Sequence, residues 1–233
     1  MAVRRGFRAK ALVARMVTHT VTALVYQQNR RERVDVFLDG RPGLSLAAVL
    51  AATLAVGQQL SDEAIAELQQ ADAREQAYAR TLHFLSFRAR SEAEVRRYLA
   101  TRHLSDADSE AVIERLTRVG YLDDQAFARA WVASRNRSRP RGAQALRYEL
   151  QQKGIHPDII RTVLADLEPA ELAYAAARPQ AERWRQLDPH AFRQKMGAFL
   201  SRRGFAYDVI RPTVDRLLRE AALNDAAGAD VDD

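Results

Sequence analysis

IERLTRVGYLDDQAFARAWVASRNRSRPRG, residues 113–142, decides the fold because it contains a helix end, a helix start and a run of arginines. Leu116 and Val119 close an apolar-periodic segment, and Gly120 fits the left-handed position that often follows the last turn of a helix. Tyr121 is placed to fold back on Leu116. The stretch therefore predicts two helices joined by a sharp turn.

The adjacent carboxylates of Asp123 and Asp124 admit two interpretations. In the first, the two residues mark the start of a helix. Asp123 caps the next helix by accepting its free N–H groups, Asp124 lies near the positive end of that helix, and Leu122 packs on Phe127 as a hydrophobic staple. As chemistry, the two carboxylates would share a proton or a metal ion, which requires converging partners. We favour helix capping because residues 120–130 contain no His, Asn or third acid.

Length and composition favour a soluble, largely helical protein. The 233 residues allow one or two ordinary domains, or one extended array, and they include only 10 glycines and no cysteine. Disulfides and thiolate metal sites are thereby excluded, which suits a reducing compartment. The basic start, MAVRRGFRAKALVARMV, lacks the continuous apolar core of a secretory signal. We expect a cytoplasmic protein that does not span a membrane.

The basic residues fall into two groups. A net charge of +6 favours an acidic partner such as nucleic acid, provided that the basic residues cluster. The first group of candidate partner- or nucleic-acid-binding residues shares one stretch with a single acid, Glu149, and consists of Arg129, Arg135, Arg137, Arg139, Arg141, Arg147 and Lys153. A second, weaker group consists of Arg193, Lys195, Arg202 and Arg203. The alternative is an ordinary solvated helical face, since arginine is common on helices.

Three segments recur at intervals of close to fifty residues, which is typical of repeat architectures. They are EVRRYLATRHL (94–104), ALRYELQQKGI (145–155) and KMGAFLSRRGF (195–205). An alignment without a gap, extended past the end of each segment, matches two sets of leucines: Leu99, Leu150 and Leu200, then Leu116, Leu167 and Leu217. The register predicts three copies of one helical unit.

Each copy is predicted to contain three helices, of which the aligned segment is the second. The first helices carry aromatic residues and span Tyr78–Phe87, Asp124–Asn136 and Ala170–Leu187. The predicted boundaries rest on a Ser91–Glu94 capping box and on two further kinds of signal. The prolines expected in first turns are Pro157, Pro169 and Pro189, and the glycines expected to end helices are Gly154 and Gly204. Because so small a unit buries little apolar surface, we expect stacked neighbours to supply its core, giving an elongated, curved array.

The N-terminal quarter has a different character. Thr20–Gln27 and Glu32–Gly40 are rich in β-branched residues and are predicted to be strands, with turn signals at Asp39-Gly40 and Pro42-Gly43. Ser45–Leu54 is then predicted to be helical, and Ser61 to cap a further helix. Two strands need cover from a helix to be stable, so this module is expected to be mixed.

The predicted fold is mainly α, a tandem array of three three-helix repeats with a small N-terminal β-containing module. Its expected parts are a basic arm that need not be ordered (1–16), the module (17–72), three repeats (73–122, 123–168 and 169–222) and an acidic, disordered tail (223–233). Pro212 is expected to kink the last helix.

Four common enzyme motifs are absent from the sequence. The chain lacks the phosphate-binding loop, the dinucleotide fingerprint, the nucleophile elbow and the zinc-protease motif. Five histidines are dispersed at no ligand spacing: His19, His83, His103, His156 and His190. We therefore expect no enzyme, with no catalytic, cofactor-binding or metal residues and no cofactor.

Several motifs resemble those of the RecX family of bacterial regulators. They are HFLSFRARSEAEVRRYL (83–99), the joint GYLDDQAFA (120–128) and YELQQKGI (148–155), which occur in order at the expected intervals. The resemblance runs from about Val21 to Leu218. Two departures are Asp108–Ser109, where later repeats carry apolar pairs, and a short hairpin at Gly40–Leu44.

The resemblance implies a non-enzymatic regulator, mainly an inhibitor, of the RecA recombinase. Such a protein lies along the groove of the RecA–DNA filament and limits its extension, ATP hydrolysis and strand exchange. Single- or double-stranded DNA is a further expected partner, and we expect a monomer. An extended repeat array and clustered arginines are compatible with this function.

Two other functions stay open from the residues alone. Paired short helices with basic flanks also describe direct DNA-binding modules, although a DNA reader would carry its base-contacting residues on one exposed helix face. A helical repeat scaffold for another protein partner would need an apolar groove. The recurring aromatic residues are interpreted as core, because Phe127 and Trp131 line one helical face and stacking platforms for bases are usually built on strands.

Overall fold

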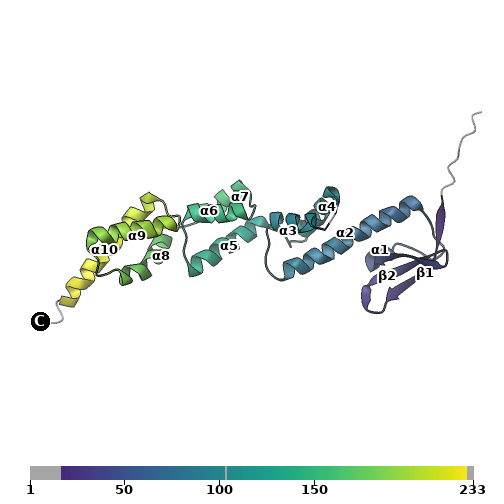
Figure 1. Ribbon diagram of the computed structural model, residues 1–233, viewed down its shortest axis with the longest axis horizontal. Coiled ribbons are helices and arrows are strands. Elements are labelled where there is room, and N and C mark those ends of the chain that lie inside the picture. Colours follow the sequence, from purple (N-terminus) through teal and green to yellow (C-terminus); the bar gives the residue numbers. More distant parts are fainter. Residues whose placement is uncertain (1–16, 103, 230–233) are drawn as a thin grey trace, which may run out of the picture. The chain divides into compact units, whose positions relative to one another are not determined.

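The computed structural model describes residues 17–102 and 104–229, with side chains described as far as Leu223. The chain divides into two compact units, with the boundary between Arg80 and Thr81 (Figure 1). The predicted basic arm (1–16) and residues 230–233 of the predicted tail lie outside the described residues.

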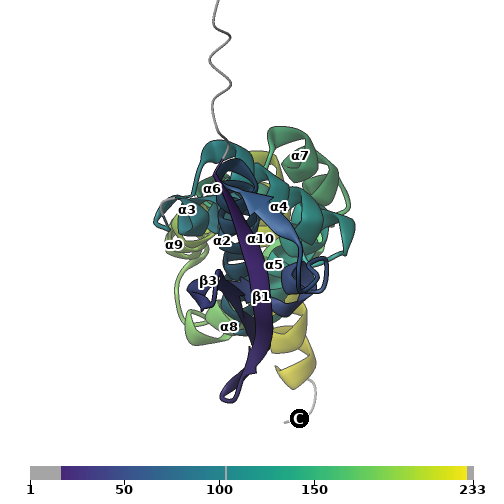
Figure 2. The same cartoon turned by 90° about the vertical axis from the view of Figure 1, so that its right-hand side faces the viewer.

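The first unit is built on a four-stranded antiparallel sheet in the order β3-β2-β1-β4. Its strands are β1 (Thr18–Gln27), β2 (Arg30–Leu38), β3 (Arg41–Ala47) and β4 (Gln59–Ser61), of which β1 is the long dark purple strand in Figure 2. One face of the sheet buries Val21, Val34, Val36, Leu44, Leu46 and Leu60. The short helix α1 (Ala48–Ala51) and the first turns of α2 (Asp62–Ser86) contribute to the same core.

The prediction for this unit was right for two strands and wrong for the segment after them. β1 and β2 occupy the predicted positions, and the turn after β2 places Asp39 and Gly40 at φ 50° and 78°, as a two-residue hairpin turn requires. The helix predicted over Ser45–Leu54 is wrong, because residues 41–47 form β3 and only residues 48–51 form α1. β4 was not predicted.

β3 forms because residues 41–47 pair with β2, which leaves only residues 48–51 of the predicted helix to form α1. Leu44 pairs with Val36 and Leu46 with Val34, so both leucines reach the buried face of the sheet. Pro42 was expected to mark a turn but lies within β3, an edge strand, where a missing N–H is tolerated.

α2 is one helix of 25 residues where two were predicted, after Ser61 and over Tyr78–Phe87. Ser61 does cap it, accepting the N–H of Ala64 at 3.2 Å. Asp72 on α2 is buried and accepts hydrogen bonds from Arg33 at 2.6 Å and from the backbone N–H of Ala47 at 2.7 Å. This charged pair, which also satisfies an edge-strand amide, fastens α2 to β2 and β3.

The second unit contains the end of α2 and the helices after it. These are α3 (Glu92–Ala100), α4 (Asp106–Arg118), α5 (Asp124–Ser138), α6 (Ala143–Gln152), α7 (Pro157–Ala165), α8 (Pro169–Arg183), α9 (Pro189–Arg202) and α10 (Tyr207–Ala229). We call the end of α2 with α3 and α4 repeat one, α5 to α7 repeat two, and α8 to α10 repeat three. The predicted capping box is present, since Ser91 Oγ accepts the Glu94 N–H at 3.2 Å and Glu94 accepts the Ser91 N–H at 3.3 Å.

The joint between α4 and α5 has the predicted geometry. Gly120 has φ 80°, and the Tyr121 N–H donates to the Leu116 carbonyl at 2.9 Å. The backbone of Tyr121 folds back, while its side chain is 58% exposed. Asp123 Oδ1 accepts the Ala126 N–H at 2.9 Å, so its capping role is confirmed.

Each of the later repeats has its own apolar core. The buried cluster of repeat two runs from Phe127 to Leu164, and that of repeat three from Ala173 to Leu217. Neither cluster includes a residue of the other repeat. The expectation that neighbours supply the core is therefore wrong for these two repeats, because three short helices with leucine, isoleucine and phenylalanine on their facing sides already enclose one another.

The departure at Asp108–Ser109 has a local explanation. Ser105 caps α4 by accepting the Asp108 N–H at 3.1 Å, and its hydroxyl donates to the Asp108 carboxylate at 2.7 Å. Asp108 and Ser109 are buried, so a polar capping pair occupies the place of two apolar residues in the other repeats.

α10 extends further than predicted. Residues 223–229, expected to belong to a disordered tail, are part of α10, whose end is rich in alanine, the residue with the highest helix propensity. Pro212 lies within α10, and the hydroxyl of Thr213 donates to the Val209 carbonyl at 2.8 Å. The predicted kink at Pro212 stays a prediction.

Candidate partner-binding surface

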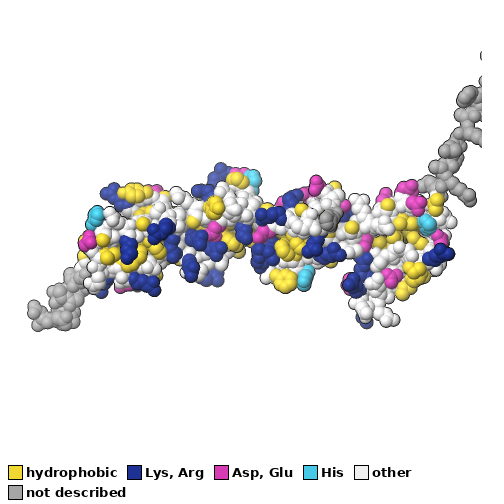
Figure 3. All heavy atoms as spheres, viewed as in Figure 1, with side chains coloured by type: hydrophobic (Ala, Val, Ile, Leu, Met, Phe, Trp, Pro, Cys, Tyr) yellow, Lys and Arg dark blue, Asp and Glu magenta, His cyan; other side chains and the backbone are white. Residues whose placement is uncertain are grey.

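Lys and Arg side chains, dark blue in Figure 3, recur over the helices of the second unit. The eleven predicted binding residues fall into two classes by exposure. Four are half-buried: Arg135, Arg141, Lys153 and Arg203. Seven are exposed: Arg129, Arg137, Arg139, Arg147, Arg193, Lys195 and Arg202.

Arg135 and Arg141 are held by one carboxylate. Arg135 Nε donates to Glu149 at 2.8 Å, and Arg141 Nη1 forms an ion pair with the other oxygen of Glu149. The indole N–H of Trp131 donates to Glu149 at 2.7 Å, and Arg135 also lies 4.5 Å from the centre of the Trp131 ring. Burial raises the pKa of Glu149, but the hydrogen bonds from Arg135 and Trp131 and the charge of Arg141 outweigh it and lower the pKa overall.

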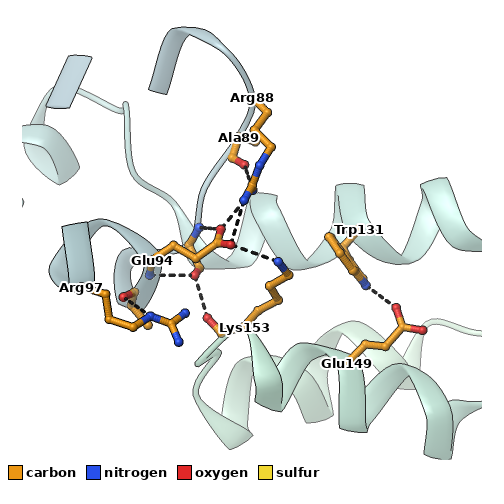
Figure 4. A network of polar contacts seen from close by, with 9 residues as sticks. Arg88, Ala89, Glu94, Arg97, Trp131, Glu149 and Lys153 are labelled. Carbon is orange, nitrogen blue, oxygen red and sulfur yellow. Dashed lines mark hydrogen bonds and ion pairs between the residues drawn. The ribbon is translucent and has the colours of Figure 1, made fainter. Parts of the chain in front are cut away.

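Lys153 belongs to a contact between repeats (Figure 4). Its ammonium donates to Glu94 at 3.0 Å, and Glu94 also accepts from Arg88 at 3.0 Å. Burial raises the pKa of Glu94, yet the hydrogen bonds from Arg88, Lys153 and the Ser91 backbone lower it to about 2. The carboxylate is therefore ionised at neutral pH and tied to two cations.

Arg203 follows the last residue of α9, and its side chain reaches the segment that leads into α6. Its Nη1 donates to the Pro140 carbonyl at 3.3 Å, and its guanidinium lies 4.5 Å from the centre of the Phe199 ring. Burial lowers its pKa, and the nearby charges of Arg139 and Arg141 lower it further. The three guanidinium groups therefore lie close enough for their charges to repel one another.

The end of the second helix in each repeat carries a cation over an aromatic ring. Arg102, Lys153 and Arg203 occupy the same position in the repeat alignment. They lie 4.8 Å from the Tyr98 ring, 4.9 Å from the Trp131 ring and 4.5 Å from the Phe199 ring, respectively. Three of these contacts at one aligned position indicate a packing role, worth roughly 0.5–1 kcal/mol each at exposed sites.

Asp124 has a role that the sequence analysis did not assign. It is half-buried, and its Oδ1 accepts the N–H of Glu92, in the first turn of α3, at 2.8 Å. Burial raises the pKa of Asp124, the hydrogen bond from Glu92 opposes the rise, and the charges of Glu92 and Asp123 add to it. Asp123 thus caps its own helix, and Asp124 caps a helix of the preceding repeat.

The seven exposed residues make few contacts with the rest of the described chain. Among the described residues, Arg193 makes one long ion pair, with Asp215 at 3.5 Å, and Lys195 lies 4.7 Å from the centre of the Trp184 ring. The remaining members have no ion-pair partner within the part of the chain that the structure describes: Arg129, Arg137, Arg139, Arg147 and Arg202. Free guanidinium groups of this kind bind carboxylates or phosphates.

Between residues 17 and 229, apart from the undescribed residue 103, no group of three His, Cys, Asp or Glu side chains could hold a metal ion. His156 serves as a helix cap, its Nδ1 accepting the Asp158 N–H at 3.3 Å, and His190 follows the Asp188 cap of α9. Within the same described residues, no helix has both the length and the apolar character needed to cross a membrane.

Comparison with known proteins identifies the family. Models of the first, second and third three-helix domains of RecX match residues 77–116, 123–164 and 166–214. The regulatory protein RecX of Bacillus subtilis (strain 168) is 31% identical over 202 residues, which cover 84% of this chain and 76% of the relative. The chain belongs to the RecX family. The resemblance seen in the sequence motifs is thereby confirmed.

Other RecX proteins agree in sequence and fold. The regulatory protein RecX of Chlorobium phaeobacteroides (strain BS1) is 37% identical over 143 residues, covering 61% of this chain and 94% of the relative. A crystal structure of a regulatory protein RecX superposes with a TM-score of 0.74 at 27% identity, covering 84% of this chain and 99% of that one. RecX from Lactobacillus salivarius shares the fold, with a TM-score of 0.59 at 23% identity over 66% of this chain and 99% of that one.

Proposed function

We propose that this RecX family protein regulates the RecA recombinase, mainly as an inhibitor. It binds the RecA–DNA filament and limits filament extension, ATP hydrolysis and strand exchange. The observation that carries the proposal is the match of all three RecX domains, in order, over most of the chain. It acts as a monomer, through binding alone and without a cofactor.

The exposed arginines support this proposal because their charges are not used in ion pairs within the described part of the chain. Arg137 and Arg147 are exposed and carry no ion pair among the described residues, so both guanidinium groups are available to acidic protein surface or to DNA phosphates. Arg141, by contrast, is held by Glu149. A test that reverses Arg141 would disturb packing as well as binding, so Arg141 is kept in the variant that tests the proposal.

The test is RecA ATP hydrolysis on single-stranded DNA, together with co-sedimentation on preformed filaments. We expect the protein to slow hydrolysis in proportion to its occupancy and to hydrolyse no ATP itself. Arg137→Glu/Arg147→Glu should weaken inhibition several-fold at unchanged melting temperature. Arg30→Glu/Arg31→Glu is the control, since it changes the charge equally at exposed positions on β2.

The direct DNA-binding alternative gives a different result in the same assay. Inhibition that disappears when excess bare DNA is added would show competition for DNA and would overturn filament binding. Inhibition that survives excess DNA, with the protein sedimenting on filaments, supports the proposal. Binding to DNA alone should fall steeply as salt is raised from low to physiological concentration.

A further inference from the structure

Repeat three contains an open groove between α9 and α10. Its volume is about 500 Å³, and its floor includes Phe205, Ile210 and Val214, which are buried in the core of the repeat. Arg193 and Arg211 line its edges. The groove thus combines an apolar floor with basic edges.

A salt bridge crosses the corresponding place in repeat one. Arg96 on α3 donates to Glu110 on α4 at 2.5 Å and to Glu92 at 2.8 Å. The guanidinium therefore lies between two carboxylates and bridges the second and third helices of the repeat. The methylene groups of an arginine held in this way can cover apolar surface while its charged end stays in water.

The repeat alignment places different residues at these three positions in repeat three. Through the register of Leu99 with Leu200 and of Ile113 with Val214, Glu92 corresponds to Arg193, Arg96 to Gly197 and Glu110 to Arg211. The two carboxylates become two guanidinium groups, and the bridging side chain between them is missing. Repeat three therefore has the charge pattern of repeat one with its sign reversed and its centre empty.

Gly197 leaves the room that a bridging group would fill. A Cβ atom built on Gly197 meets nothing within 4 Å, so the space above this position is open. Arg211 is exposed and makes no ion pair among the described residues, and Arg193 makes only the long contact with Asp215. Asp215 also lines the groove. Its one negative charge balances one of the two guanidinium groups of the groove, and the positive charge of the other is left uncompensated.

We propose that this groove binds a short acidic segment of a protein partner. A carboxylate of that segment lies between Arg193 and Arg211, where the arginine of repeat one lies between two carboxylates. A neighbouring apolar side chain of the segment packs over Gly197 onto Phe205 and Val214. Gln144, Gln194 and Ser201 at the edges offer hydrogen bonds to its backbone.

The test measures binding of labelled peptides to the full-length protein by fluorescence anisotropy. The probe is the six-residue peptide Glu-Asp-Phe-Leu-Glu-Asp, and the matched probe replaces each acid by its amide. We expect the acidic peptide to bind at least about tenfold more tightly, because each charge-assisted hydrogen bond is stronger than a neutral one. Equal affinity for the two peptides would overturn the proposal.

Two variants localise the binding. Arg193→Glu/Gly197→Arg/Arg211→Glu transplants the salt-bridged arrangement of repeat one and should abolish peptide binding while the thermal melt stays cooperative. Gly197→Leu fills the groove without changing charge and should weaken binding at least tenfold, whereas Ala198→Leu, on the exposed neighbouring position of α9, should not. Retained binding in a folded Gly197→Leu protein would place the peptide elsewhere and overturn the proposal.

A nucleic acid is the competing occupant. If a single-stranded oligothymidylate bound the native protein and lost its affinity in Gly197→Leu, while the acidic peptide did not bind at all, the groove would be assigned to nucleic acid instead. Because the assay contains no recombinase, its failure would leave the proposed regulation of RecA unaffected.

Discussion

Equivalent helix ends meet at the two junctions of the second unit, but different atoms join them. At the first junction, between repeats one and two, Ser91 Oγ donates to the Lys153 carbonyl at 2.7 Å, and Lys153 is paired with Glu94. At the second, between repeats two and three, the Gly142 N–H donates to the Arg203 carbonyl at 2.9 Å. The repeat alignment matches Ser91 with Gly142 and Lys153 with Arg203.

The difference shows that one docking geometry can be stabilised either by side chains or by close approach of backbones. A Cβ atom on Gly142 would lie 2.1 Å from the Gly204 carbonyl oxygen, so the second junction has no room for a side chain there. At the first junction a serine is accommodated, and a carboxylate between two cations adds charge. A Cβ atom on Gly154 would also lie 2.4 Å from Ala93 Cβ at the first junction, so both junctions should respond to side-chain volume, but only the first should respond to pH through Glu94.

The largest effect is expected from Gly142→Val. Gly142 has an ordinary φ of −73°, so the cost comes from collision with the Gly204 and Phe205 backbone and not from strain at Gly142 itself. We expect a loss of about 3 kcal/mol or more in the free energy of unfolding, measured by urea denaturation.

Gly197→Ala is the matched control for that variant. This helical glycine faces open space, so the added methyl should stabilise α9 by about 0.5–1 kcal/mol. A Gly142→Val protein as stable as the native one would show that the second junction is not formed in solution.

Glu94→Gln should destabilise the protein by about 2 kcal/mol at pH 7, since it removes the charge that Arg88 and Lys153 share. Because the pKa of Glu94 is lowered to about 2, its contribution is complete above its ordinary pKa of 4.5 and is lost as the pH falls toward 2. Urea denaturation should be measured for the native protein and for Glu94→Gln at several pH values between 2.5 and 7. The difference between their free energies of unfolding should shrink as the pH falls. Glu114→Gln, at an exposed position of α4, is the control.

Asp124→Ala should cost about 1 kcal/mol, because the Glu92 N–H at the start of α3 loses its acceptor. Asp124→Asn should cost less, since an amide oxygen can still accept this hydrogen bond and the raised pKa shows that a charge is disfavoured here. Thermal melts of the two variants compare these outcomes. Equal losses would mean that the charge, and not the acceptor, stabilises the first junction.

The smallest effect is expected from Arg137→Glu, within about 0.5 kcal/mol of the native stability, because Arg137 is exposed and has no ion pair among the described residues. Arg141→Glu should destabilise by about 1–3 kcal/mol, since it places a second carboxylate beside Glu149. Denaturation of the two variants side by side would test the division of the basic residues into two classes. Similar losses in both would contradict it.

The sequence alone determined the repeats and most of the helix ends in the second unit. Gly120, Asp123 and the Ser91–Glu94 box act within a few residues of themselves, and the hydrogen bonds that they make are local. A regular register of leucines likewise needs only a helix to place them on one face. Family membership was evident from these same short motifs.

The tertiary structure decided which strands pair and which arginines are free. Residues 45–47, which were predicted to be helical, belong to β3 because they pair with β2. Arg141 and Arg137 are indistinguishable in the sequence, and only the position of Glu149 on the next helix ties one of them and leaves the other exposed. Asp124 accepts a hydrogen bond from the backbone of Glu92, which lies 32 residues earlier in the sequence. Such assignments depend on contacts between distant segments, and no local pattern of residues encodes the distance between them.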